Sequence, residues 1–204
     1  MQYVYADNNA STRPAPEVIE TMKLALDELH GNPSSVHILG RTVREKIDVA
    51  REQVAAMLSV KPAEILFTSG GTESNHLAVM GIPNARPENK HIITSQVEHL
   101  SVKSLFERLE KQGYEVTWLM ADENGNLDLG ELSSALRQDT ALVSLITANH
   151  ETGIVWPIAE AGALCREANV TFHTDAVMAA GWADNDMNER VDAATFSAHK
   201  FQGP

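Results

Sequence analysis

The sequence is poor in cysteine and in basic residues, and both shortages exclude classes of protein. Of 204 residues only Cys165 is a cysteine, so the chain has no internal disulfide framework, and a reducing compartment fits. Lysine and arginine number 16 against 28 aspartates and glutamates, which gives a formal net charge of −12. That charge disfavours nucleic acid and an anionic membrane surface as partners.

Long apolar runs are also absent. No stretch approaches the length needed to cross a bilayer, and the opening "MQYVYADNNAST" lacks the basic and apolar regions of a signal peptide. We therefore expect a cytoplasmic protein. The composition, 43% hydrophobic and 22% charged, is that of a globular protein, and the length suffices for one substantial core.

Periodic apolar residues predict two helices near the start of the chain. Residues 14–31 begin with prolines, carry apolar residues at helical spacing and stop at Gly31. Residues 40–60 repeat the pattern, with charged residues on the opposite face, as in a surface helix.

From residue 64 onward, predicted strands alternate with predicted helices. Helices are expected directly after Gly70 and over 99–113, 129–137 and 157–169. Apolar runs predict strands at 64–69, 90–96, 114–121, 141–149, 170–176 and 192–199. This alternation predicts an α/β fold with a mostly parallel sheet flanked by helices on both faces.

Ligands of such sheets collect at the carboxyl ends of the strands. The run 64–69 leads into Gly70-Gly71-Thr72 and a helix, whose free N–H groups could bind a phosphate or a carboxylate. A tight strand-to-helix turn is the alternative. The run matches neither a Walker A sequence nor a dinucleotide fingerprint, which disfavours a nucleotide ligand.

The other strand ends carry Glu98-His99, Asn149, Asp175 and Lys200. Glu98-His99 could be a helix-capping pair, and Asp175 could cap a helix that begins with "DAVMAAG". An aspartate after an apolar strand otherwise costs desolvation unless a cation or a donor meets it. Together, the glycine loop, the histidine ring, the aspartate and the lysine fit pyridoxal phosphate. This cofactor needs a phosphate-binding loop, an acid at its ring nitrogen and a lysine that forms a Schiff base. No metal site is predicted.

Seven stretches in order carry a resemblance to a known family: "YADNNASTRP", "GNPSSVH", "TSGGTESNHLA", "VEHLSV", "ANHETGIVWPI", "FHTDAV" and "FSAHKFQGP". They resemble the cysteine desulfurases of the NifS/IscS type, pyridoxal-phosphate-dependent enzymes of fold type I in the class V aminotransferase group. The resemblance covers essentially the whole chain and corresponds to the N-terminal portion of that family.

The resemblance implies two catalytic residues and a cofactor-binding set. Lys200 would hold the cofactor as a Schiff base, and His99 would stack on its ring and act as an acid or base. Asp175 would pair with the pyridine nitrogen. The phosphate cup would be formed by Gly71, Thr72, Ser197 and His199. Asn149 would contact the ring hydroxyl or the substrate carboxylate, and Met178 would lie beside the ring.

Three departures from the family pattern matter, and one of them is that the usual Asn-Asn-Glu reads Asn149-His150-Glu151 here. The family has Gln where this chain has Met178, and Met cannot donate the hydrogen bond that Gln gives to the cofactor's ring oxygen. The family chain is also much longer, and its further part carries a nucleophilic cysteine and a small domain. Cys165 is not that cysteine, because it lies in the apolar pattern of 157–169.

The resemblance also implies domains and partners. Residues 1–14 would associate with the small domain, and 15–204 would be a truncated cofactor-binding large domain. We therefore expect unpaired strand edges, exposed apolar surface, and a homodimer or a complementing C-terminal chain. Why the chain stops at Pro204 stays open: a fragment, a trimmed chain or one half of a split protein.

The implied activity takes sulfur from L-cysteine, giving L-alanine and an enzyme persulfide. A scaffold protein for iron–sulfur cluster assembly, or another sulfur acceptor, would receive the sulfur. This chain alone is expected to be inactive. The alternatives are an inactive or split-partner homologue with a scaffold or regulatory role, and a selenocysteine lyase or aminotransferase of the same fold.

Overall fold

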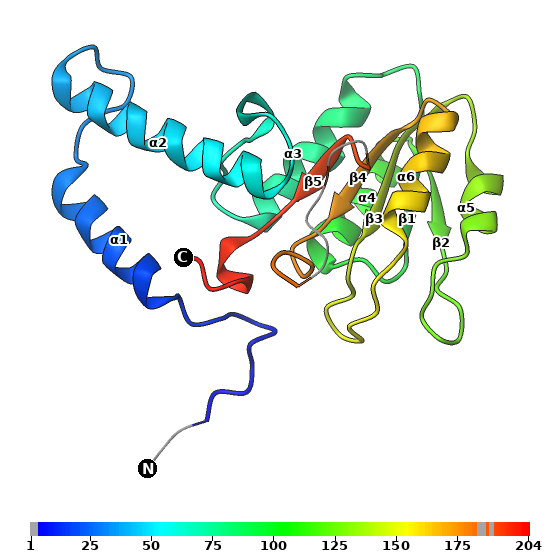
Figure 1. Cartoon of the computed structure of the whole chain (residues 1–204). Helices are drawn as coiled ribbons and strands as arrows, with labels where there is room; N and C mark the ends of the chain where they lie inside the picture. Colours follow the sequence, from blue (N-terminus) through cyan, green and yellow to red (C-terminus); the bar gives the residue numbers. More distant parts are fainter. Residues whose placement is uncertain (1–3, 183–186, 188–189) are drawn as a thin grey trace. The chain divides into compact units, whose positions relative to one another are not determined.

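The computed structural model describes residues 4–182, 187 and 190–204 (Figure 1). They form two compact units. One comprises Thr68–Ser197, and the other comprises the described residues up to Phe67 together with Ala198–Pro204.

The unit Thr68–Ser197 is built on a five-stranded sheet in the order β2-β1-β3-β4-β5, with every neighbouring pair parallel. The predicted α/β fold with a parallel sheet is confirmed. The strands are β1 (His91–Ser95), β2 (Glu115–Leu119), β3 (Thr140–Ile146), β4 (Thr171–Asp175) and β5 (Ala193–Thr195).

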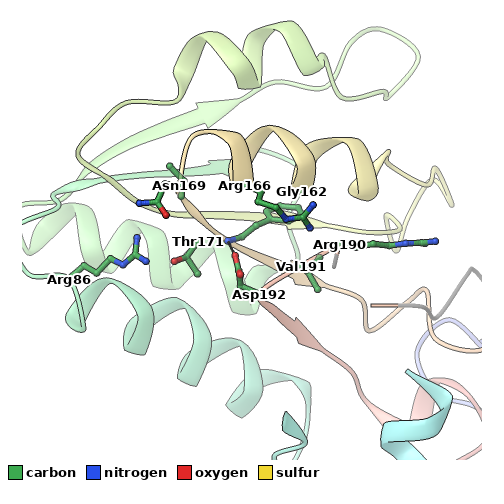
Figure 2. A pocket seen from close by; sticks show the side chains of 10 residues that line it. Arg86, Gly162, Arg166, Asn169, Thr171, Arg190, Val191 and Asp192 are labelled. Carbon is green, nitrogen blue, oxygen red and sulfur yellow. Dashed lines mark hydrogen bonds between the residues drawn. The ribbon is translucent and has the colours of Figure 1, made fainter. Parts of the chain in front are cut away.

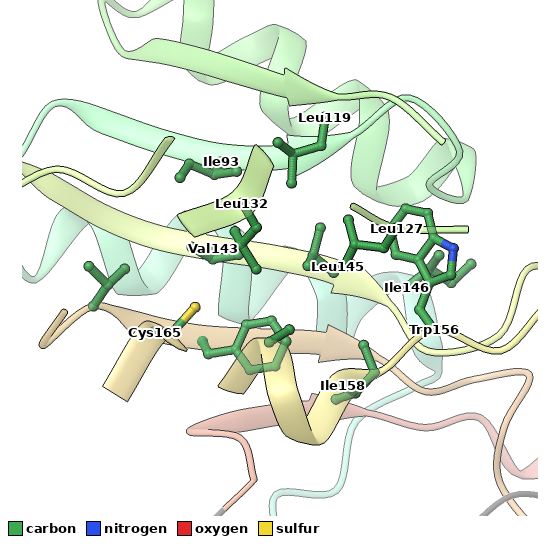
Figure 3. Packing of buried hydrophobic residues seen from close by; sticks show 13 residues of the cluster. Ile93, Leu119, Leu127, Leu132, Val143, Leu145, Ile146, Trp156, Ile158 and Cys165 are labelled. Atoms are coloured by element: carbon green, nitrogen blue, oxygen red, sulfur yellow. The ribbon is translucent and has the colours of Figure 1, made fainter. Parts of the chain in front are cut away.

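Helices cover both faces of this sheet. They are α3 (Gly71–Asn84), α4 (Leu100–Lys111), α5 (Leu129–Ala135) and α6 (Ile158–Glu167). Successive side chains of a strand point to opposite faces. Accordingly, Ile93 packs in a cluster with residues of α5 and α6 (Figure 3), whereas Ile92 packs with residues of α3 and α4. β3 is buried along its whole length, as a central strand between two helical layers must be.

Cys165 belongs to the α5–α6 cluster (Figure 3). It is fully buried on α6, and burial raises the pKa of its thiol to about 12. A thiol in that state is not a nucleophile at neutral pH. Its expected role as a small core residue is confirmed.

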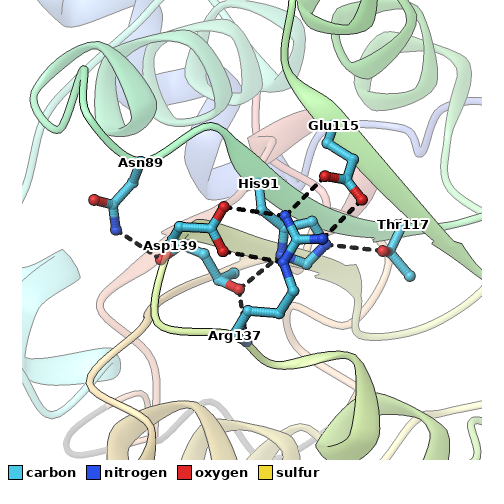
Figure 4. Close-up of polar contacts among 7 residues, drawn as sticks. Asn89, His91, Glu115, Thr117, Arg137 and Asp139 are labelled. Carbon is cyan, nitrogen blue, oxygen red and sulfur yellow. Dashed lines mark hydrogen bonds and ion pairs between the residues drawn. The ribbon is translucent and has the colours of Figure 1, made fainter.

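The amino ends of β1, β2 and β3 are joined by a polar cluster (Figure 4). Arg137 donates to both carboxylate oxygens of Glu115, at 2.7 and 2.9 Å, and to both of Asp139, at 3.0 and 3.1 Å. Buried His91 bonds Thr140 through Nδ1 at 2.7 Å and Thr117 through Nε2 at 2.8 Å. Three strands are thus tied together at the edge where they begin.

The second unit contains α1 (Pro16–Glu28), α2 (Ile38–Met57) and the short 3-10 helices η1 (Pro62–Glu64) and η2 (Ala198–Lys200). The helices predicted over 14–31 and 40–60 are confirmed. Backbone bonds tie the segment after β5 to the N-terminal segment: Thr12 N–H donates to the His199 carbonyl at 2.8 Å, and Ala15 N–H to that of Gln202 at 2.9 Å.

The prediction of a strand at 64–69 is wrong. Glu64 ends η1, and residues 65–69 belong to no strand among the described residues, although Ile65 has extended backbone. Leu66 and Phe67 are 71% and 49% exposed. A β-rich pattern makes a strand only where a neighbouring strand supplies ladder hydrogen bonds.

The strand predicted at 192–199 is shorter than expected. β5 ends at Thr195, and His199 and Lys200 lie in η2. Residues 177–182 form turns rather than the helix that "DAVMAAG" could begin.

Several large apolar side chains are exposed, which confirms the exposed apolar surface expected from the sequence. α1 has no buried residue, and Leu26 is 82% exposed. Other exposed positions are Leu24, Val36, Ile38 and Leu77. None of the helices in the described ranges is long and apolar enough to cross a membrane.

Replacing Arg137 by alanine should lower the free energy of unfolding of the chain by no more than about 1 kcal/mol, because one guanidinium bridges two carboxylates that are both exposed to solvent. The loss should shrink at high salt. Urea unfolding at low and high ionic strength measures both. Arg108→Ala, an exposed arginine on α4, is the control, and an equal loss in the two variants would contradict the bridging role.

Candidate functional site

The carboxyl ends of four adjacent strands bring most of the predicted site residues to one edge of the sheet. Asp175 is the last residue of β4. His99 follows β1, Asn149 follows β3 and Ser197 follows β5. The strand order reverses between β1 and β3, since the chain passes from β1 outward to β2 and then returns to β3. Such a reversal opens a crevice at the carboxyl edge, where parallel sheets bind ligands.

The start of α3 faces the same edge. Gly70 has φ +154° and ψ −179°, a backbone region essentially restricted to glycine. A Cβ on Gly71 would lie 3.0 Å from Val177 Cγ2 and 3.5 Å from Ser197 Cβ. The helix start is therefore close to the segments that follow β4 and β5. With exposed Thr72 in its first turn, it offers N–H groups and a positive dipole end for an anion.

Asp175 is a buried carboxylate, only 3% exposed. Its Oδ2 accepts from Asn75 Nδ2 at 2.8 Å, and its Oδ1 accepts from Val177 N at 3.0 Å. Burial raises its pKa, and these two hydrogen bonds together with the His99 and His150 imidazoles act in the lowering direction. The acid is thus held in place by donors, and a cationic ligand would favour its ionised form.

His99 and His150 form an edge-to-face pair, with ring centroids 5.2 Å apart and ring planes 73° apart. His99 also caps α4: its Nδ1 accepts from Ser101 N at 3.2 Å and lies 2.7 Å from Ser101 Oγ. The capping alternative is therefore correct for His99. Capping orients the ring, which stays exposed, so it is compatible with a role in binding.

The Asn149 side chain fastens two loops at this edge. Its Nδ2 donates to Val97 O at 3.0 Å, and its Oδ1 accepts from Glu151 N and Thr152 N at 3.0 and 2.9 Å. Both ends of the amide are therefore used within the chain. Met178 lies half-buried in the turn after β4.

His199 and Lys200 belong to the other unit. Lys200 Nζ donates to Asn9 O at 2.6 Å, and His199 Nδ1 lies 3.3 Å from Ser11 Oγ. Partial burial, and then the nearby Lys200 charge, lower the pKa of His199. The predicted set thus divides between the units: Gly71, Thr72, His99, Asn149, Asp175, Met178 and Ser197 in Thr68–Ser197, and His199 and Lys200 in the other.

Sequence reasoning assigned no supporting role to the residues that hold this edge together, although it named Glu98 as part of a possible capping pair. Glu98 is 4% exposed, and its Oε1 accepts from Ser95 Oγ at 2.6 Å and from Ile146 N at 2.9 Å, joining the ends of β1 and β3. An acid directly after a buried strand was the available signal. Asn75 and Ser101 were also missed. Asn75 lies one helical turn after Gly71 and so shares its face of the helix, but that spacing does not indicate which carboxylate the amide meets.

A cavity of about 210 Å³ lies at the opposite edge (Figure 2). It is lined by residues that open β4 and precede β5, such as Thr171 and Asp192, and by Arg86, Arg166 and Arg190. Because these residues lie at the amino ends of the strands, this cavity is separate from the candidate site. Among the described residues, no group of three or more His, Cys, Asp or Glu could hold a metal ion.

The sequence profile of the family described as aminotransferase class-V matches residues 4–204. The chain belongs to the class-V aminotransferase family. Proteins of this family and the cysteine desulfurases depend on pyridoxal phosphate.

Curated members of the family resemble the chain over its whole length. It is 46% identical to cysteine desulfurase 2 of Trichormus variabilis over 205 residues, covering 100% of this chain and 52% of that protein. It is 46% identical to cysteine desulfurase IscS of Dictyoglomus turgidum over 203 residues, covering 98% of this chain and 52% of the relative. The chain spans about half the length of the curated relatives it matches.

Solved structures of similar proteins agree. A NifS-like protein matches with a TM-score of 0.96 and 37% identity, covering 100% of this chain and 57% of its own. SspA in complex with cysteine matches with a TM-score of 0.95 and 37% identity, covering 99% and 59%. The fold is therefore that of a little more than half of a NifS-like protein.

Replacing buried Glu98 by glutamine should change how stability depends on pH. Burial raises the Glu98 pKa to about 8. Between its unfolded value near 4.5 and pH 8, the folded state keeps a proton that the unfolded state releases, so wild-type stability falls as pH rises, by at most about 1.4 kcal/mol per pH unit. Glu98→Gln removes that fall, so its melting temperature relative to wild type should increase from pH 5 to pH 8.

Thermal unfolding followed by circular dichroism at four pH values measures this difference. Glu107→Gln, exposed on α4, controls for the change in net charge. A Glu98→Gln difference that stays constant with pH would show that Glu98 is ionised in the folded chain.

Proposed function

We propose that this chain is the cofactor-binding part of a pyridoxal-phosphate-dependent cysteine desulfurase. The observation that carries the proposal is the buried, donor-held Asp175 at the same sheet edge as the glycine-led start of α3. An acid for a ring nitrogen and an anion-binding helix start are two of the groups that the cofactor requires. The relatives named cysteine desulfurase supply the reaction.

The residues present fit the cofactor. Asp175 would hold a proton on the pyridine nitrogen, and Asn75 and Val177 N–H would keep its carboxylate ionised beside that cation. Gly71, Thr72 and Ser197 would donate to the phosphate. His199, whose pKa is lowered, would join them as a neutral hydrogen-bond donor rather than as a charge.

The remaining residues would act on the ring and on the substrate. Lys200 would release its bond to Asn9 O and attach the cofactor through Nζ. His99 would stack on the ring and move a proton. Asn149 would act through the β1–α4 loop that it fastens, or by contacting the ring hydroxyl or the substrate carboxylate. When bound, pyridoxal phosphate supplies an electron sink for the reaction at the substrate's α-carbon.

The rest of the proposed reaction needs groups from outside this chain. The substrate would be L-cysteine and the products L-alanine and a persulfide. Buried Cys165 cannot carry that persulfide, so the thiolate would come from a C-terminal segment or chain. We propose a homodimer or a complemented chain in the cytoplasm, with a sulfur-acceptor scaffold protein for iron–sulfur cluster assembly as partner. Residues 1–14 would associate with the small domain, and 15–204 would form the large domain.

Adding pyridoxal phosphate to the purified chain should produce absorbance in the visible region that is stable to dialysis. Lys200→Ala should abolish the dialysis-stable band, because the covalent link is lost. Lys111→Ala, an exposed lysine on α4, should keep it. A folded wild-type chain without a Lys200-dependent band would exclude the cofactor role.

An activity assay distinguishes the cofactor-binding part of an active enzyme from an inactive homologue. The loaded chain is mixed with a C-terminal chain that carries the cysteine, and thiol-dependent release of alanine from L-cysteine is measured. Alanine release supports the desulfurase. A cofactor band without release supports the scaffold alternative, and preference for selenocysteine or for an amino-group acceptor supports the other reactions of this fold.

Met178→Gln should strengthen cofactor binding by about threefold to tenfold, since a side-chain amide adds one hydrogen bond that a thioether cannot donate. Equilibrium dialysis with pyridoxal phosphate gives the dissociation constants, and the visible maximum should shift with the new bond to the ring oxygen. Met178→Leu is the matched control, and gains of equal size in both variants would point to packing instead.

A further inference from the structure

An unbroken chain of side chains links Asp175 to His99. Asn75 Nδ2 lies 2.8 Å from Asp175 Oδ2 and 3.2 Å from Ser101 Oγ, and Ser101 Oγ lies 2.7 Å from His99 Nδ1. Asn75 is on α3, Ser101 is in the first turn of α4 and Asp175 ends β4. Three elements thus meet through one amide.

The direction of these hydrogen bonds is determined at both ends. At the first end, the amide nitrogen of Asn75, which only donates, lies 2.8 Å from Asp175 Oδ2, so that carboxyl oxygen is an acceptor. At the other end, the backbone N–H of Ser101 donates to His99 Nδ1 at 3.2 Å. A backbone N–H only donates, so Nδ1 is an acceptor.

The two ends require the same arrangement in the middle. Because Nδ1 accepts, the Ser101 hydroxyl donates its hydrogen there, and its oxygen is left to accept the second amide hydrogen of Asn75. Asn75 is 1% exposed, and its Oδ1 has no hydrogen-bond partner among the described residues. A flipped amide would instead direct Oδ1 at the Asp175 carboxylate. The Asn75 side chain therefore donates both of its amide hydrogens, whereas its oxygen accepts no hydrogen bond from the described residues.

We propose that Asn75 is a positioning residue of this site: it donates one hydrogen to Asp175 and one to Ser101, so that neutral His99 keeps its ring hydrogen on Nε2. The functional meaning rests on the proposed cofactor role. The ring atom of His99 that exchanges protons would then be Nε2, and the acid that faces the pyridine nitrogen would be oriented by the same amide.

Nitrogen NMR of the cofactor-free chain tests the direction of the relay. In wild type, two-bond proton–nitrogen correlations should show the His99 hydrogen on Nε2. A hydrogen on Nδ1 would overturn the proposal. Ser101→Ala should move the Nδ1 resonance of His99, because only the backbone donor remains, and Ser104→Ala, exposed on the same helix, should not. An unmoved Nδ1 resonance in Ser101→Ala would break the link to His99.

Asn75→Ala tests the other end of the relay. Loss of the amide donor should raise the pKa of Asp175, followed by its carboxyl carbon resonance, and should weaken binding of pyridoxal phosphate by about tenfold. Asn84→Ala, exposed at the end of α3, is the matched control. An unchanged Asp175 titration in folded Asn75→Ala would overturn the role of Asn75.

The readouts separate this proposal from the proposed function. The tautomer and the Asp175 titration are measured without cofactor, so they can hold even if pyridoxal phosphate does not bind. Conversely, a normal Lys200-dependent band with the His99 hydrogen on Nδ1 would leave the function standing and the relay refuted.

Discussion

Parallel pairing of the strands is the constraint on which this structure depends. It makes every strand begin at one edge and end at the other, and it requires helices on both faces, which bury β3 completely. The edge where strands begin carries the Arg137 cluster and the cavity. The edge where they end carries Asp175, His99 and Asn149. One topological rule therefore separates the part that stabilises the sheet from the part proposed to bind the cofactor.

At the carboxyl edge, buried and half-buried polar groups position the residues that would meet the ligand. Glu98 joins the ends of β1 and β3, Asn149 fastens the loop before His99, and Asn75 holds Asp175. The imidazole of His99 stays accessible. This arrangement supplies rigidity before any ligand arrives, which lowers the entropy lost on binding.

Much of the fold could be predicted from the sequence, because hydrophobic periodicity reports which face of each element is buried. The strands around Ile92, Leu142 and Phe172 and the helix around Phe106 followed from it. Residues 64–69 did not, since their pattern describes a strand but not the neighbour that would pair with it. Asp175 and His99 could be found because they follow strands directly. Asn75 could not, because a polar residue inside a helix pattern does not indicate which distant carboxylate it will meet.

The tie between the two ends of the chain has a consequence for folding. Thr12 and Ala15 bond the backbone of His199 and Gln202, so this contact closes a loop of nearly the entire sequence. Closing so long a loop costs chain entropy before any hydrogen bond compensates, whereas the contacts within each βα unit are local. We therefore expect the short helix that carries Lys200 to acquire its partners after the sheet has formed. In that order of events, Asp175 and His99 would be in place before the amine that is proposed to attach the cofactor.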